Sequence, residues 1–118
     1  MRMSMSCLAA VIALGHGYAA AACENPSAVP AIPDGKTSTM EQMLAAQAQV
    51  KTYQAAMQVF LECLDGELKA EGEEAPEEFK SLMVDRHNAA VAEMELVATA
   101  FNDQIKAYRA ANPAPAAN

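Results

Sequence analysis

Two cysteines, Cys23 and Cys63, are the residues with the most evident chemistry in this chain. A third, Cys7, lies in an N-terminal segment that we expect to be removed. An even pair of cysteines in an oxidising compartment is most simply a disulfide. The alternative is that Cys23, which follows a run of alanines (19–22), is the lipidated first residue of a bacterial lipoprotein. Lipid attachment favours a larger aliphatic residue three positions earlier, where this chain has Ala20, so the sequence favours the disulfide.

A second candidate group combines methionine and histidine. His87 is flanked by Met83 and Met94, one and two helical turns away. Thioether and imidazole groups suit Cu(I), so periplasmic copper binding is an alternative function. Methionines at helical spacing are more often core residues, however. We therefore assign no metal site and no cofactor.

Acidic residues are numerous, but their placement does not indicate catalysis. One group falls in a charged connector, and Glu93 and Glu95 lie on a predicted helix. Paired carboxylates perform acid–base chemistry when a cleft perturbs their pKa values, and an exposed connector offers no cleft. No glycine-rich phosphate loop, zinc spacing or serine–histidine motif occurs, so we expect no enzyme activity. The connector residues are Glu71, Glu73, Glu74, Glu77 and Glu78.

The first 22 residues have the three parts of a signal peptide. Arg2 supplies a positive charge, residues 7–14 are an apolar run of eight (CLAAVIAL), and residues 19–22 are small. This run is too short to cross a bilayer, and its flanks suit signal peptidase. We expect cleavage after Ala21 or Ala22. The protein is then exported, to the periplasm if the source is Gram-negative and otherwise to the medium.

The remaining chain is acidic. Removal of Arg2 leaves seven of the eight basic residues against fifteen acidic ones, so the net charge is 7 − 15 = −8. Nucleic acids and anionic membrane surfaces repel such a chain. No later segment has the length of a membrane span. These features leave proteins, or a second copy, as the expected partners.

The pattern of the rest predicts an all-α fold: an extended strap followed by an antiparallel two-helix hairpin. Residues 23–38 contain three prolines and then Asp34-Gly35, which predicts an extended strap with a turn. A capping box with Ser38 as the cap and Glu41 reaching back then starts a helix over about 39–70. We expect this helix to weaken at Asp65-Gly66. Its apolar residues step alternately by three and four, as in a heptad pattern: Met43, Ala46, Val50, Tyr53, Met57, Phe60 and Leu64.

A second helix is predicted over about 76–111, with Pro76 in its first turn. The short connector makes the two helices antiparallel neighbours. Residues 112–118 form a disordered tail. The main apolar line of this helix is Met83, His87, Ala90, Met94, Val97, Phe101 and Tyr108; Leu82, Ala89 and Leu96 widen it, and Val84, Val91, Ala98 and Ile105 form a further line.

The strap is long enough to reach Cys63. That cysteine lies 24 residues after Thr39, roughly 36 Å along a helix. The fifteen residues from Cys23 to Ser38 extend about 46 Å in a polyproline-like conformation. The strap can therefore turn at Asp34-Gly35, return along the hairpin and pair with Cys63. We further hypothesise that Asn88, Glu95 and Asn102 hydrogen-bond its backbone, the alternative being that this row is solvated.

Several short motifs resemble those of small exported bacterial proteins without an assigned function. The resemblance implies export and a helical hairpin, and it implies no activity. We therefore expect an exported structural or protein-interaction module, with copper binding or a lipid-anchored envelope subunit as alternatives. The motifs are Cys23, AIPDG (31–35), VKTY (50–53), Cys63 and HNAAVAEMELVATAFNDQ (87–104).

Overall fold

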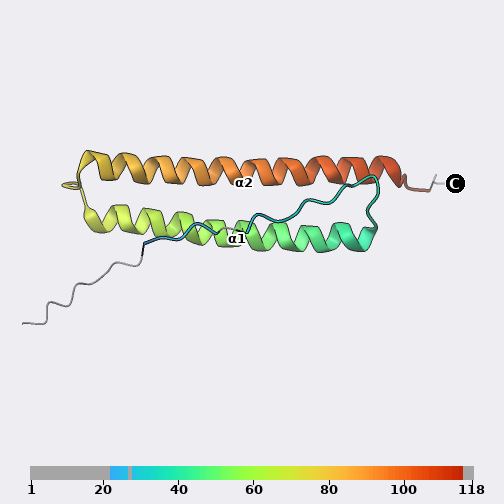
Figure 1. Cartoon of the computed structure of the whole chain (residues 1–118), viewed down its shortest axis with the longest axis horizontal. Coiled ribbons are helices and arrows are strands. Elements are labelled where there is room, and N and C mark those ends of the chain that lie inside the picture. Colours follow the sequence, from blue (N-terminus) through green and yellow to red (C-terminus); the bar gives the residue numbers. More distant parts are fainter. Residues whose placement is uncertain (1–21, 27, 116–118) are drawn as a thin grey trace, which may run out of the picture.

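A computed structural model describes residues 22–26 and 28–115. The predicted signal peptide, except Ala22, and the last three residues of the predicted tail lie outside these ranges. Two long helices make up most of the described chain, α1 (Met40–Glu71) and α2 (Glu77–Ala111). They pack side by side with opposite directions, joined by a short connector (Figure 1). The predicted all-α hairpin is confirmed, and the described residues contain no strand.

The helix α1 begins one residue later than the capping prediction. Thr39, not Ser38, is the cap: its Oγ1 accepts from the Gln42 N–H at 3.2 Å. In return, Gln42 Oε1 accepts from the Thr39 N–H at 2.8 Å. The Ser38 hydroxyl is used elsewhere, because it donates to the Asp34 carbonyl at 2.6 Å. The sequence allows a capping box with either Ser38 or Thr39 as the cap. Because the turn before the helix uses the Ser38 hydroxyl, Thr39 is the cap.

The ends of the helices at the connector follow from two residue types. Gly72, with φ of 74°, terminates α1, and glycine adopts this left-handed region without strain. Pro76 precedes α2 as its cap rather than lying in its first turn. The expected weakening at Asp65-Gly66 is wrong, since α1 continues through both residues to Glu71. The helical hydrogen bonds and the packing of Leu64 and Leu68 outweigh one exposed glycine.

The core is a narrow line between the helices. All seven residues of the predicted apolar line of α1 are buried, and Leu61 joins them. On α2 only Met83, Ala90, Val97 and Phe101 are fully buried. Leu82 and Leu96, expected to widen this face, are 54% and 71% exposed. They lie one residue before Met83 and Val97, a rotation of about 100° that carries them away from α1.

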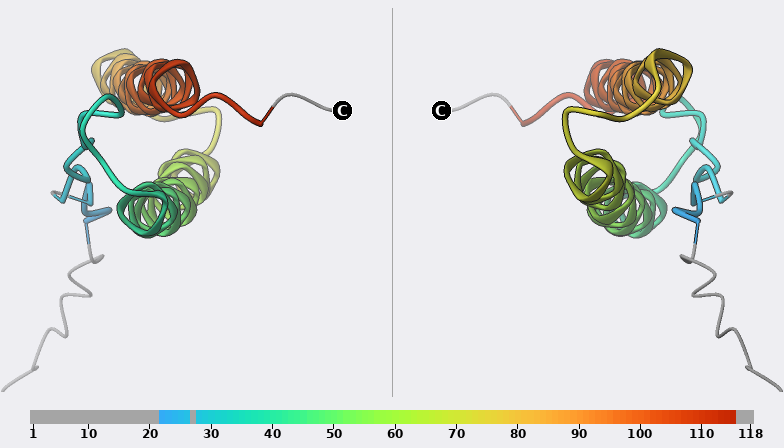
Figure 2. Two further views of the ribbon diagram at one scale, coloured as in Figure 1. Left: turned by 90° about the vertical axis from the view of Figure 1, so that its right-hand side faces the viewer. Right: turned by 90° about the vertical axis from the view of Figure 1, so that its left-hand side faces the viewer.

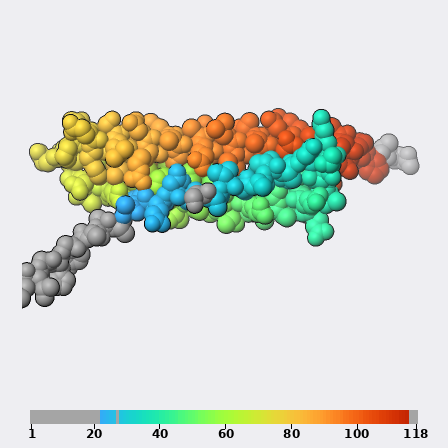
Figure 3. Space-filling view, in the orientation of Figure 1, coloured from blue at the N-terminus to red at the C-terminus, as the bar shows by residue number. Residues whose placement is uncertain are grey.

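The strap lies in the groove on one side of the helix pair (Figures 2 and 3). Its described residues form no helix or strand before the turn at Asp34. That turn is closed by two bonds to the Asp34 carbonyl, from the N–H of Thr37 at 3.2 Å and of Ser38 at 3.0 Å. Ile32 packs against the core, whereas Val29 is 54% exposed. The strap therefore covers one groove of the hairpin and leaves the other uncovered.

Candidate functional site

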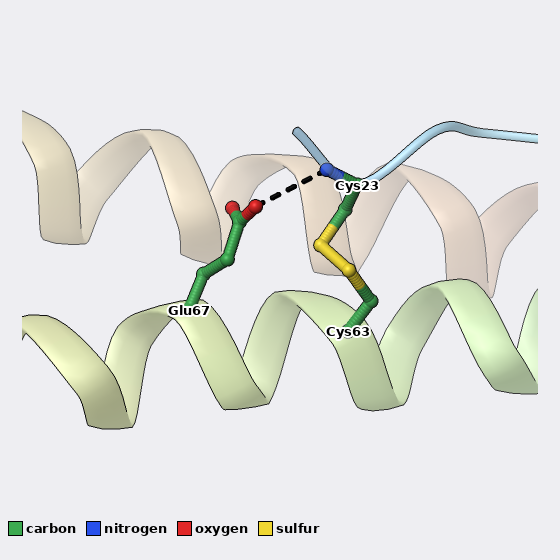
Figure 4. Close-up of side chains that lie close together, drawn as sticks. All are labelled: Cys23, Cys63 and Glu67. Atoms are coloured by element: carbon green, nitrogen blue, oxygen red, sulfur yellow. Dashed lines mark hydrogen bonds between the residues drawn. A yellow bond between two sulfur atoms is a disulfide. The ribbon is translucent and has the colours of Figure 1, made fainter. Parts of the chain in front are cut away.

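A disulfide between Cys23 and Cys63 fastens the strap to α1, with 5.8 Å between the two Cα atoms (Figure 4). The pairing is the one expected from the two cysteines. Cys23 is buried, and Cys63 is half-buried on the side of α1 that faces the strap. The bridge closes a loop of 40 residues. By the loop-entropy relation, such a closure stabilises the fold by about 4 kcal/mol.

The backbone of Cys23 is held by both helices. Its N–H donates to Glu67 Oε1 on α1 at 3.1 Å. Its carbonyl accepts from Arg86 Nη2 on α2 at 2.7 Å. The Arg86 guanidinium also lies over the Phe60 ring, 5.4 Å from the ring centre, a favourable cation–π geometry. We call Cys23, Cys63, Glu67 and Arg86 the clamp, because together they join the strap to both helices.

A second attachment lies at the other end of the strap. The Gly35 N–H donates to Gln104 Oε1 at 2.9 Å. Gly35 is buried directly against the backbone of α2. A side chain here would meet the Gln104 carbonyl oxygen and would come within 2.8 Å of the Tyr108 nitrogen. The close approach of strap and helix therefore requires glycine at position 35.

The hypothesis that Asn88, Glu95 and Asn102 bind the strap is wrong. All three residues are exposed. The hydrogen bonds come instead from Glu67, Arg86 and Gln104, which the sequence analysis did not single out. The sequence did contain one signal: Gln104 follows Met83, Ala90 and Val97 at the same spacing of seven residues. A polar residue on a buried line needs a partner.

Tyr53 makes a buried polar contact between the helices. Its hydroxyl donates to Glu93 Oε1, and its side chain is 4% exposed. Burial, followed by the hydrogen bond to Glu93 and the charge of Glu93, raises the pKa of Tyr53 to about 12. Glu95, considered above as a partner of Glu93, is exposed. The two carboxylates therefore have different surroundings and form no acid–base pair.

The acidic connector offers no enclosed site either. All five of its glutamates are exposed. Lys80 of α2 donates to Glu77 Oε1 at 3.0 Å and to the Glu73 carbonyl at 2.8 Å. These contacts hold the connector against the start of α2.

The three residues of the Met/His group differ in how far they are buried. Met83 is buried, while His87 and Met94 are half-buried. Met83 and His87 line one hollow together with Leu64 and Leu68, and Met94 is not on that lining. Within the described residues, one set of His, Cys, Asp or Glu side chains brings three ligand atoms within 4.8 Å of one another: Cys23, Cys63 and Glu67. Their sulfurs are bonded to each other, so this group is a covalent clamp rather than a thiolate site.

The two grooves of the hairpin differ. Hollows lined by strap residues lie along α1 at Tyr53 and at Phe60. Other hollows are lined by both helices and by no strap residue: Leu68 with Val84 near the connector, and Leu44 with Ile105 at the opposite end of the hairpin. No helix among the described residues is long and apolar enough to cross a membrane.

Comparisons of the chain with protein-family models, with curated proteins and with solved structures found no match. The resemblance to small exported proteins therefore stays a prediction.

Proposed function

We propose that this chain is an exported, non-catalytic interaction module that pairs with a second copy of itself. The observation that supports the proposal is the groove left uncovered on the side away from the strap. A hairpin with one groove closed by its own strap has a single long face for another pair of helices. Two such hairpins would form a four-helix bundle.

The uncovered groove is lined mainly by apolar side chains, with Gln47 in the hollow at one end and His87 in the hollow at the other. Val84 and Ile105 line its two ends. Val91 and Ala98 lie between them at seven-residue spacing, and both are half-buried. On α1, Leu44 and Leu68 line the same two hollows. Leu44 and Val84 remain 56% and 49% exposed, so a second pair of helices would remove further apolar surface from water.

The charges beside the groove suit a second copy. The flanking row of α1 is Leu44, Lys51, Gln58 and Asp65, and that of α2 is Asn88, Glu95, Asn102 and Arg109; all eight residues are exposed. The two rows carry two cations and two anions, so they are neutral although the whole chain is acidic. Two acidic molecules can therefore meet on this face without opposing charges of one sign.

The face is also large enough for a stable dimer. The shorter helix, α1, has 32 residues and is about 48 Å long. Two adjacent helices are about 20 Å wide, which gives up to roughly 1,000 Å² on each copy. Stable interfaces bury about 800 Å² per partner.

Export is supported by the three-part segment over residues 1–22 and by the disulfide, which persists in oxidising compartments. The compartment is the periplasm if the source is Gram-negative, and otherwise the medium. The alternative, a lipid anchor at Cys23, would place the hairpin at an envelope membrane and leave Cys63 without its disulfide partner.

The test compares two double variants of the disulfide-bonded protein. Leu44→Glu with Val84→Glu places two charges in the uncovered groove. Leu82→Glu with Leu96→Glu places two charges on exposed leucines of the outer face of α2. Light scattering after size exclusion, over a wide concentration range, should show a parent dimer that only the groove variant loses. Circular dichroism confirms that both variants keep their helices.

Two results would contradict the proposal. A parent chain that stays monomeric at every concentration has no second copy as its partner. Loss of the dimer in the outer-face variant, with the groove variant unaffected, would place the interface on Leu82 and Leu96 instead.

Copper binding is the alternative from another class. The hollow shared by Met83 and His87 favours it, because a soft thioether and an imidazole open onto the same space. Copper that copurifies in stoichiometric amount, and that is lost in a His87→Ala, Met83→Leu variant, would support this function.

A further inference from the structure

The sulfur of Cys23, its backbone N–H and its carbonyl oxygen each have a partner in the structure. The sulfur is bonded to Cys63, the N–H donates to Glu67, and the carbonyl accepts from Arg86. The residue is 5% exposed. Ala22, the residue before it, is exposed. Among the described residues, the hydrogen bonds that hold the strap therefore begin at Cys23.

We propose that Cys23 is the first residue of the mature protein and that Glu67 binds its α-amino group. This inference rests on the proposed export of the chain. Water adds across the Ala22–Cys23 peptide bond, so that Ala22 keeps a carboxylate and Cys23 acquires an ammonium group. The nitrogen that donates to Glu67 as an amide then donates as a cation from the same position (Figure 4).

The surroundings of this nitrogen suit a cation. Side-chain ion pairs within the described residues join Lys80 to Glu77 and Lys106 to Asp103, so Glu67 has no basic side chain as its partner there. The charged groups around the Cys23 backbone are Glu67 on α1, Arg86 on α2 and Glu24 on the strap. The amide N–H of Cys23 already donates to a carboxylate, and an ammonium group at the same position adds an attraction between opposite charges. Cleavage at Cys23 would therefore strengthen the clamp.

The same geometry disfavours a lipid anchor. A lipidated N-terminal cysteine carries a thioether on its sulfur and an acyl group on its nitrogen. In this structure the sulfur is bonded to Cys63 and cannot also carry a thioether, although an acylated nitrogen would keep the N–H that donates to Glu67. One cysteine cannot serve both purposes, so the clamp and the lipid exclude each other.

The first experiment is the intact mass of the exported protein, with and without reduction and alkylation. The expected mass begins at Cys23 and gains two hydrogens on reduction. A chain that still begins at Met1 would contradict export itself. A chain that begins at Ala22 or earlier, after removal of the leader, would leave export intact and overturn this inference alone. A lipid-modified cysteine would overturn it as well.

The second experiment tests the role of Glu67. Disulfide-bonded chains that begin at Cys23 or at Ala20 are compared, each with Glu67 or with Glu67→Gln. We expect the substitution to raise the unfolding equilibrium constant about three- to tenfold more in the chain that begins at Cys23. Glu41→Gln, which removes an exposed carboxylate in the first turn of α1, far from Cys63, is the matched control and should affect both chains equally. An equal effect of Glu67→Gln in both chains would show that Glu67 does not bind the amino group.

Discussion

Replacement of Gly35 by alanine tests whether the strap is part of the fold at the end away from the disulfide. The new Cβ would collide with the Gln104 carbonyl oxygen and would lie 2.9 Å from the carbon of that carbonyl and 2.8 Å from the Tyr108 nitrogen. These are backbone atoms within α2, which continues to Ala111. They cannot rotate away as a flexible side chain does. The turn at Asp34-Gly35 must therefore lift from the helix.

The expected cost follows from what the lifted turn loses. The bond from the Gly35 N–H to Gln104 stabilises the fold by about 1 kcal/mol. Partial exposure of Ile32, which packs against the core, costs about another 1 kcal/mol. Alanine also restricts the unfolded chain, which stabilises the protein by about 0.5 kcal/mol. The net loss in the free energy of unfolding is therefore about 1 to 2 kcal/mol.

The assay is urea unfolding followed by far-ultraviolet circular dichroism on the oxidised protein. Gly66→Ala is the matched control. Gly66 is exposed within α1, and a Cβ there meets nothing within 4 Å. This variant should gain up to about 1 kcal/mol from helix propensity. If Gly35→Ala is as stable as the parent, the strap does not contact α2 as described, and the reasoning about this attachment fails.

Two further predictions concern the disulfide and Tyr53. Cys63→Ser should lower the free energy of unfolding by about 4 kcal/mol. Reduction of the parent protein should lower its urea midpoint to that of the Cys63→Ser variant. A parent protein whose midpoint does not change on reduction would contradict this. Tyr53 has a folded pKa of about 12 against 10.0 in the unfolded chain, so the folded state binds this proton more tightly. This contribution is constant below pH 10.0 and is lost as the pH rises towards about 12. Tyr53→Phe should remove that part of the pH dependence, measured as the difference between the two unfolding curves; identical curves would refute it.

The hairpin is predictable from local pattern, and the strap contacts are not. The apolar residues of α1 step by three and four without interruption, so the buried line from Met43 to Leu64 follows from helix geometry alone. The bonds of Glu67, Arg86 and Gln104 join residues 44, 63 and 69 positions apart. No local periodicity encodes such pairs, because each depends on where the strap settles.

On α2, the sequence predicts burial for two leucines that are exposed in the structure. Leu82 and Leu96 were grouped with the core because they are apolar neighbours of Met83 and Val97. With a single helix to pack against, only a narrow arc of α2 is buried, and a residue about 100° away is already in solvent. The width of a buried arc depends on the number of neighbours, which the sequence of one helix does not state.

The strap changes what the hairpin can offer to a partner. Two helices have two equivalent grooves, and a hairpin without a strap could be approached from either side. The clamp at Cys23 and the attachment at Gly35 hold the strap at both ends of one groove. The remaining groove is lined mainly by apolar side chains between neutral rows, so the proposed dimer would have one available side. The strap, fixed by one covalent bond and three hydrogen bonds, therefore determines which side of a thin hairpin is left uncovered. Loss of the disulfide should then lower the stability of the fold and also let a second copy approach either groove.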